Sequence, residues 1–491
     1  MRLSLQQHVP PSSFSLLRLL LRLKALVLGV TVVILLFRRL VMHFRRIILR
    51  PTGYTTGQFD PALIQAHQRR IVLSDLHMGG GDLLDDFQTD AIFVRFVDQY
   101  VKSDEPTDLI LAGDTFEFLQ IRLPDLRDDE YSDSAARQRM EAILEAHRPV
   151  IEALARFIAQ PRHCLTILVG NHDFELHFPS ARQCLREALG VKVDDLRLRF
   201  GLHYHGGGVY IVHGNQFDPW NRFVHFDGVS EPFEMIRGSQ LVKEVINDLE
   251  DDPLPFAHLI DNIKPSSALF WYLLALPRLR NQASRRFLAR GVTGFLQVVA
   301  WPASHQLSPI GVESLPEAMP DLPILHRLWA AVVRFRRGRV ARRREVARQV
   351  SNVAGAVNPS DEVLLQLQSE ATRQIAREQR TFSDQSTRAM LEIARRPAHQ
   401  HDTLFVCGHT HLARIVPLGL GQFYVNTGSW TEIILDIATM RRQEQRFPFL
   451  EVTYPQGSRP VGRLLVWDDT DRIAHPWHEE VTPVRGRAVR P

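Results

Sequence analysis

Short apolar runs alternate with helical patterns along much of the chain. The runs are four or five residues long and each ends in polar or glycine-rich sequence: Arg70–Ser74, Asp108–Ala112, Leu165–Val169, Val209–Val212 and Leu404–Cys407. Such runs predict buried strands. Asp86–Val101 and Ser134–Ala159 have helical patterns, and Gln422–Asn426 and Arg463–Trp467 predict closing strands. Strands that alternate with helices indicate a layered α/β core.

Each of the five short apolar runs is followed by side chains that can bind metal. They are Asp75 and His77; Asp114; Asn171 and His172; His213; and His409 and His411. Because chemistry in α/β sheets gathers at the carboxyl ends of strands, we expect these residues to meet. Oxygen and imidazole ligands without thiolates suit Mn²⁺, Fe, Zn²⁺ or Mg²⁺. One such piece is weak evidence, since chance supplies it often, but five in this order form a specific signal.

The five pieces read SDLH at 74–77, GDTFE at 113–117, GNHD at 170–173, HG at 213–214 and GHTH at 408–411. The sequence thereby resembles the calcineurin-like metallophosphoesterase family, whose pattern is D-x-H, G-D-x-x-[DE], G-N-H-[DE], H-G and G-H-x-H. The resemblance covers roughly residues 70–215 and 400–470. It implies an α/β fold, a four-layer α/β/β/α sandwich, and a dinuclear metal centre that hydrolyses a phosphorus–oxygen ester or anhydride bond.

The resemblance also implies roles for single residues. One metal would be held by Asp75, His77 and His411, and the other by Asn171, His213 and His409, with Asp114 bridging both. A carboxylate can bridge cations about 3.5–4 Å apart. His172 would be catalytic, stabilising charge or protonating the leaving oxygen, and Asp173 would orient its imidazole. Mn²⁺ is the expected metal, with Fe, Zn²⁺ and Mg²⁺ as alternatives. We interpret five further histidines as structural: His177, His203, His205, His225 and His258.

The motifs are most similar to the branch of the family that cleaves the lipid A precursor UDP-2,3-diacylglucosamine at its pyrophosphate. That branch carries G-D-x-F-E and G-N-R-D-F and a helical lid that grips acyl chains. This chain differs in having His172 where the branch has arginine, Asn215 after the H-G pair where the branch has aspartate, and a longer insertion. We expect a phosphodiester or pyrophosphate substrate that is lipid-linked. The alternative is a soluble-substrate phosphoesterase, either a protein phosphatase or a nuclease. The intact ligand set disfavours a third interpretation, an inactive scaffold.

Few strand patterns occur between His213 and His409, and we interpret residues 225–395 as a mostly helical insertion, or cap, over the catalytic face. Its aromatic run Ser267–Leu276 suits either an acyl groove or the insertion's own core. Arg334–Arg348 has eight arginines and one glutamate, which suits a solvated helix face or a phosphate-rich surface. No nucleic-acid module accompanies these arginines, so the sequence does not favour a nucleic-acid partner.

The first 50 residues differ in composition from the rest. They contain nine Lys and Arg and no acid, which leaves 50 basic against 55 acidic residues, a net charge of −5, after Arg50. Leu16–Phe37 is apolar, but its uncharged part Ala25–Phe37 has only 13 residues, short of the ~20 that span a bilayer. We interpret residues 1–50 as a hydrophobic, basic helix that associates with the cytoplasmic face of the inner membrane, either spanning it or lying on it. The alternative is a buried helix of a soluble domain.

The chain therefore divides into five expected parts. They are the arm 1–50, the metallophosphoesterase core 60–224, the insertion 225–395, the second part of the core 396–475 and a basic tail 476–491. The three widely spaced cysteines, Cys164, Cys184 and Cys407, form no disulfide framework and indicate a reducing compartment.

Overall fold

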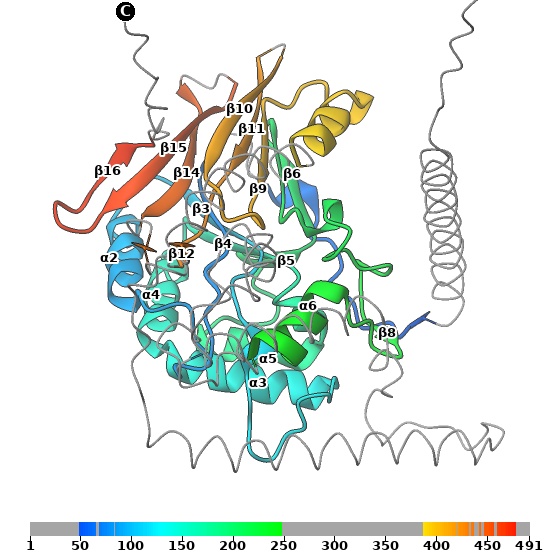
Figure 1. Ribbon diagram of the computed structural model, residues 1–491. Coiled ribbons are helices and arrows are strands. Elements are labelled where there is room, and N and C mark those ends of the chain that lie inside the picture. The colour runs from blue at the N-terminus through cyan, green and yellow to red at the C-terminus, as the bar shows by residue number, and fades with distance from the viewer. Residues whose placement is uncertain are drawn as a thin grey trace, which may run out of the picture.

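The computed structural model describes nine segments of the chain: residues 49–64, 68–82, 84–247, 386–419, 421–431, 434–436, 441–442, 446–455 and 459–477. Most of the predicted arm, most of the insertion and most of the tail lie outside these residues. Within them the fold is mixed α/β, as the sequence predicts (Figure 1).

The larger sheet has seven strands. Their order is β16 (Ile473–Pro476), β15 (Val461–Asp468), β14 (Phe447–Thr453), β2 (Arg69–Leu73), β3 (Thr107–Ala112), β4 (Cys164–Leu168) and β5 (Leu198–Gly201). Strands β2 to β5 are parallel to one another, whereas β14 runs antiparallel to β2. Three strands whose ends were predicted to carry chemistry, β2, β3 and β4, are therefore adjacent and parallel, and their carboxyl ends meet at one edge.

The second sheet has five strands. Their order is β10 (Arg414–Gly419), β11 (Gln422–Asn426), β9 (Leu404–Cys407), β7 (Val209–Val212) and β6 (His203–Gly206). The strands β7 and β9 pair in parallel although about two hundred residues separate them, with Ile211 opposite Val406. Three of the five predicted strands thus belong to the larger sheet and two to the smaller one. Two short ribbons complete the strands: β1 (Arg50–Pro51) with β8 (Ser230–Glu231), and β12 (Ile434–Asp436) with β13 (Arg441–Arg442).

The two sheets pack face to face through a buried apolar cluster. In β2 and β3, Val72 and Ile110 belong to this cluster, whereas their neighbours Ile71 and Leu109 belong to a second cluster on the other face. This alternation follows from the period of two in a strand. Because both faces are covered, Ile71–Leu73 of β2 and Leu109–Ala112 of β3 are apolar at consecutive positions, as is typical of parallel strands in α/β proteins. The polar residues of the two strands lie at their amino ends.

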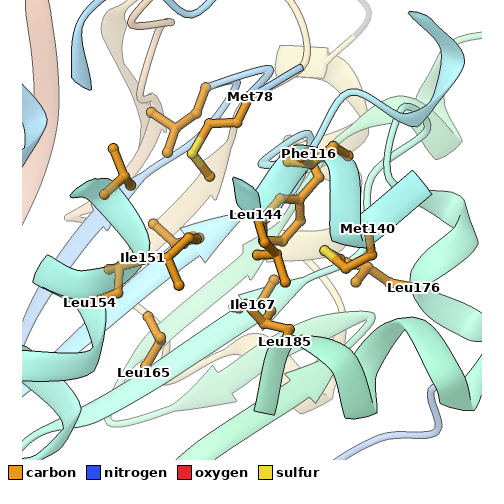
Figure 2. Close-up of a cluster of buried hydrophobic side chains, with 14 of the residues drawn as sticks. Met78, Phe116, Met140, Leu144, Ile151, Leu154, Leu165, Ile167, Leu176 and Leu185 are labelled. Atoms are coloured by element: carbon orange, nitrogen blue, oxygen red, sulfur yellow. The ribbon is translucent and has the colours of Figure 1, made fainter. Parts of the chain in front are cut away.

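Helices cover the outer face of the seven-stranded sheet. They are α2 (Asp90–Val101), α3 (Asp133–Ala146), α4 (Arg148–Ile158) and α5 (Pro179–Ala188). Figure 2 shows part of this core, where Ile151 and Leu154 of α4 and Met140 of α3 lie against Leu165 and Ile167 of β4. Helical residues 386–394, yellow in Figure 1, pack on the five-stranded sheet through Met390 and Ile393.

The structure changes two helix predictions. The predicted helix Ser134–Ala159 is two helices, α3 and α4, that meet at His147. The reason is Pro149 in the first turn of α4, since proline is tolerated there but breaks a helix interior. The other helix begins at Asp90 rather than Asp86, because the carboxylate of Asp85 accepts backbone N–H bonds from Gly79, Gly81 and Phe87 and so orders a loop.

Short helices lie near the carboxyl edges of both sheets. They include η2 (Phe118–Gln120), η3 (Phe174–His177), η4 (Asn215–Phe217), α6 (Arg237–Leu241) and the π-helical turn η5 (Val242–Ile246). Two others are η1 (Pro61–Leu63) and η9 (Pro397–His399). None of the helices in the described part of the chain has the length and apolar composition needed to cross a bilayer. The predicted arm is not tested by this finding.

Candidate metal centre

Left-handed backbone conformations mark the ends of the strands. Among the described residues, five of the predicted ligands have φ between 49° and 69°: Asp75, His77, Asp114, His409 and His411. Such angles are uncommon outside glycine, and strain of this kind persists only where the surrounding structure imposes it. The only other non-glycine residue of this kind in the described part of the chain is Arg472, in the turn between β15 and β16. Backbone strain is therefore concentrated where ligand atoms converge.

The first ligand group joins the end of β2 to the loop after β9. Nε2 of His411 lies 3.4 Å from Oδ1 of Asp75 and 3.2 Å from Nε2 of His77. The Asp75 carboxylate accepts two bonds from the backbone N–H of His409, each 3.0 Å long, which fastens this loop to β2. All three side chains are buried. Three ligand atoms of Asp75, His77 and His411 lie within 4.8 Å of one another, so they can bind one cation.

The second ligand group forms around Asp114, at the end of β3. Oδ2 of Asp114 lies 2.9 Å from Nε2 of His213, and ligand atoms of Asp114, His213 and His409 lie within 4.8 Å of one another. The same Oδ2 lies 4.0 Å from Nε2 of His77 in the first group. Asp114 is therefore placed between the two groups, as a bridging ligand must be.

The donor set fits metal ions at the level of single atoms. Oδ1 of Asn171 is buried and has no hydrogen-bond partner among the described residues. An unpaired buried oxygen costs free energy of folding unless it binds a group such as a metal ion. His213 donates from Nδ1 to the carbonyl of Ala112 at 3.0 Å, so Nε2 is the atom directed to Asp114. Hydrogen bonds of this kind fix the ring orientation of histidines that bind metals.

Three motif glycines are required by close packing against the ligands. A Cβ atom on Gly170 would lie 2.2 Å from Oδ1 of Asp114, and one on Gly408 would lie 2.3 Å from Oδ2 of Asp75. Gly113, which also has φ of +90°, would place a Cβ atom 2.6 Å from the ring of His213. Each glycine thus leaves space for a neighbouring ligand rather than contributing one.

Burial and mutual charge shift the pKa values at this centre. Burial raises the pKa of Asp75, with Asp114 adding to the rise. Burial also acts on Asp114, but His213 and the neighbouring histidines hold the pKa of Asp114 well below its usual range. For His213, burial by itself would lower the pKa, but the charges of Asp114 and Asp75 raise it to about 9. The site therefore keeps Asp114 anionic by surrounding it with positive charge, which divalent cations supply more strongly than imidazolium does.

The structure corrects the role expected for Asp173. Its Oδ1 accepts the backbone N–H of Gly170 at 2.6 Å and its Oδ2 that of Thr115 at 2.8 Å. Burial and the charge of Asp114 raise the pKa of Asp173 to about 7. Because both oxygens bond to backbone, Asp173 joins the loops after β3 and β4 and does not orient the imidazole of His172.

Glu117 takes that role instead. Its Oε2 bonds to Nδ1 of His172 and lies 2.9 Å from Nδ1 of His77. The glutamate is fully buried, which by itself would raise its pKa, but His172 and His77 lower it to about 2. The backbone N–H of His172 donates to Oδ1 of Asp114 at 2.8 Å, which holds the residue beside the ligand groups. Glu117 is the acid of the G-D-x-x-[DE] pattern, so the motif itself carries the signal for this residue.

A second acid outside the predicted set is Asp218, which follows η4. Its Oδ2 lies 3.2 Å from Nε2 of His409, which leaves Nδ1 as the atom with which His409 can bind a metal. Nδ2 of Asn221 and the backbone N–H of Trp220 hold the carboxylate in place. Asn215 follows the H-G pair directly, and Asp218, four residues after that pair, contacts the predicted ligand His409. No motif identifies Asp218.

Away from this centre, the structure gives partners to histidines that we expected to be structural. Nε2 of His205 and Nδ1 of His399 each lie 2.8 Å from Oδ2 of Asp402, before β9 begins. His177 bonds through Nδ1 to Thr56. His258 lies outside the described residues.

The fold and the site together define a mixed α/β protein with two adjoining oxygen and imidazole ligand groups at the carboxyl ends of its strands. Residues 69–273 match the calcineurin-like phosphoesterase family. The match supports placing this part of the chain in that family, which implies a metal-dependent phosphoester hydrolase. No curated protein matches the chain.

Proposed function

We propose that this protein is a dinuclear-metal phosphoesterase whose two cations share Asp114. The observation that carries the proposal is the position of Asp114 Oδ2, 2.9 Å from His213 Nε2 in one ligand group and 4.0 Å from His77 Nε2 in the other. A carboxylate between two ligand groups is the arrangement that a pair of closely spaced cations requires. The described core, with helices outside both packed sheets, supports the four-layer sandwich proposed with this function.

The bound cations would activate water and neutralise charge on the phosphoryl oxygens. The first would be held by Asp75, His77 and His411, and the second by Asn171, His213 and His409. The chain's own contribution beyond these ligands is His172. The anionic Glu117 accepts a hydrogen bond from Nδ1 of His172. A hydrogen bond from His172 to the phosphoryl or leaving-group oxygen would therefore come from Nε2, which carries a proton in the imidazolium form.

We further propose a phosphodiester or pyrophosphate substrate that is lipid-linked, such as UDP-2,3-diacylglucosamine, with Mn²⁺ as the cellular metal. Support comes from the basic apolar arm 1–50 and from the aromatic run at Phe270, Trp271 and Tyr272. The same arm supports association with the cytoplasmic face of the inner membrane. One observation favours a second candidate, a soluble phosphoester substrate: His172 stands where the lipid-cleaving branch has arginine.

Hydrolysis assays on the full-length protein in detergent test these proposals. The substrates are bis-p-nitrophenyl phosphate, UDP-2,3-diacylglucosamine, a phosphoprotein and a single-stranded nucleic acid, each with Mn²⁺ and with excess chelator. We expect metal-dependent cleavage of the chromogenic diester and of the lipid-linked substrate. Cleavage of only the phosphoprotein or nucleic acid would support the second candidate, and no metal-dependent cleavage of any substrate would refute the proposed function.

A further inference from the structure

A lysine ammonium is buried beside the candidate metal centre. Lys243 lies in η5, and its Nζ atom is inaccessible to solvent and has no hydrogen-bond partner among the described residues. Its Nζ atom lies 4.9 Å from the centroid of the Tyr131 ring. Burying an ammonium without a hydrogen-bond acceptor costs free energy of folding, and a bound ligand that supplies an acceptor would offset this cost.

The charges around Lys243 do not supply that acceptor. Burial and the charge of Arg139 lower the pKa of Lys243 to about 8, and Glu175, Asp128 and Glu117 oppose this change. Glu175 is already bound by Arg139, with an N–O distance of 2.7 Å. Asp128 is exposed, whereas Nζ is buried. The nearby carboxylates therefore act on Lys243 only through space.

Lys243 lines a cavity of about 120 Å³. A single water needs roughly 10–15 Å³ measured in this way, so the cavity has room for a phosphoryl or carboxylate group. Asn247, one turn further along the chain, lines the same cavity; its Nδ2 donates to Leu119 O, and its Oδ1 is buried without a partner among the described residues. The other polar residues that line the cavity are Arg122, Asp128, Asp129 and Gln240. Among the described lining residues, the ammonium of Lys243 and Oδ1 of Asn247 are a buried donor and a buried acceptor without hydrogen-bond partners.

The cavity adjoins the catalytic residues. Leu119, Tyr131 and Met235 line it, and the same three residues line a smaller hollow that also contains Asn171 and His172. Glu117, which bonds to His172, is close enough to act on the charge of Lys243. The two hollows therefore share a wall, with Lys243 lining one and His172 lining the other.

We propose that Lys243 binds a second anionic group of the substrate, a phosphoryl or carboxylate oxygen next to the scissile phosphate. The inference rests on the proposed function and narrows it, because it favours substrates with two neighbouring anionic groups, such as pyrophosphate diesters, over simple phosphodiesters. Asn247 Oδ1 accepts a hydrogen bond from a hydroxyl or N–H group of the same ligand.

A matched pair of substrates tests this inference: the p-nitrophenyl esters of uridine 5′-monophosphate and of uridine 5′-diphosphate, which differ by one phosphoryl group. Products are separated by chromatography, and kcat and KM are measured for the wild type and for Lys243→Met. Methionine keeps the unbranched apolar stem of lysine, is one atom shorter and removes the charge. The exposed Lys192 provides a matched control as Lys192→Met.

We expect Lys243→Met to lower the ratio of kcat/KM for the diphosphate ester to that for the monophosphate ester by about 10–100-fold, the effect of losing one charge-assisted hydrogen bond. Most of the change should appear in KM, and Lys192→Met should leave the ratio as in the wild type. If the wild type cleaves both esters and Lys243→Met leaves the ratio unchanged, the inference is wrong while the proposed function stands. If the wild type cleaves neither ester with metal present, the proposed function itself fails.

Discussion

The carboxylate of Glu117 holds the imidazole of His172 through Nδ1. Because the pKa of Glu117 is lowered to about 2 by His172 and His77 against the effect of burial, the glutamate is ionised and can only accept hydrogen bonds. The proton on this edge of the ring therefore lies on Nδ1 of His172. Its Nε2 atom is then the one that can face a substrate, and Glu117 is a positioning residue for it.

Replacing Glu117 with glutamine should affect two measurable quantities: kcat, through the position of His172, and metal affinity, through the ligand His77. We expect Glu117→Gln to lower kcat by ~10²-fold or more at saturating metal, within the range for a disturbed proton donor. It should also weaken metal binding by about 10–100-fold, because Glu117 supports the ligand His77 as well. Steady-state kinetics and metal titration measure the two effects.

Two further variants serve as a comparison and a control. His172→Ala should lower kcat by ~10²–10⁴-fold with metal content nearly intact, and Glu152→Gln, on the exposed side of α4, should change neither quantity. Loss of metal in His172→Ala, measured by elemental analysis, would make His172 a ligand and refute the role given to it here.

Asp218 should govern one metal more than the other. Its Oδ2 lies 3.2 Å from Nε2 of His409, on the opposite side of the ring from the atom left for a metal. We expect Asp218→Asn to weaken the second metal by about 10–100-fold and to leave the first less affected. Stepwise metal titration by calorimetry would resolve the two events. Equal weakening of both metals, or of neither, would contradict the assignment of His409 to the second group.

The ion pairs of His147 should make stability depend on pH. Nε2 lies 2.8 Å from Asp85 and Nδ1 lies 2.8 Å from Asp90, so both nitrogens donate and the ring is charged. Burial alone would lower the pKa of His147, but the two aspartates raise it to about 9. Since this lies above the model-peptide value of about 6.5, the contribution is complete below pH ~6.5 and is lost as pH rises through ~9.

The size of that contribution is roughly 3 kcal/mol, from a shift of about 2.5 units. We expect the free energy of unfolding of the wild type to exceed that of His147→Gln most at pH 6, and the difference to shrink by pH 9.5. Denaturant titrations at both pH values measure it, and the exposed His401→Gln serves as the control. A difference that is the same at both pH values would show that His147 is not held as a cation.

The arm can be removed without cutting the described core. Thr52 and Thr56 bond to Val229 and His177, so a truncated chain should lack residues 1–47 and retain these contacts. We expect the full chain to pellet with membranes, and the truncated chain to stay in the supernatant and still cleave bis-p-nitrophenyl phosphate. Recovery of the full chain in the soluble fraction would refute membrane association through the arm.

The sequence predicted what depends on local pattern and missed what depends on tertiary contact. Short apolar runs such as Leu109–Ala112 formed strands because both of their faces are buried. The motif residues converge because their strands are parallel, which the pattern also predicts. The local pattern does not show that β2, β3 and β4 lie in one sheet and β7 and β9 in another, because strand pairing across about two hundred residues leaves no local sequence signal. Two sheets were expected only from the family resemblance.

The carboxylates that contact the site histidines were likewise only partly predictable from local sequence. Glu117 stands in a motif and could have been assigned a role, whereas Asp218 reaches His409 only through the fold of the η4 loop. Asp173 lies next to His172 in sequence, yet both of its oxygens bond to backbone N–H groups of Gly170 and Thr115. Adjacency in sequence is thus a poor guide to which acid orients which histidine.

The most direct measurement of the central claim is the metal content of Asp114→Ala. The wild type, loaded with Mn²⁺ and freed of loose metal by gel filtration, should carry about two metal ions per chain and hydrolyse bis-p-nitrophenyl phosphate. Asp114→Ala should carry at most one and show no hydrolysis, because it removes the shared ligand. Asp104→Ala, at an aspartate whose side chain is 95% exposed, should match the wild type. Two metals and full activity in Asp114→Ala would contradict the bridged centre.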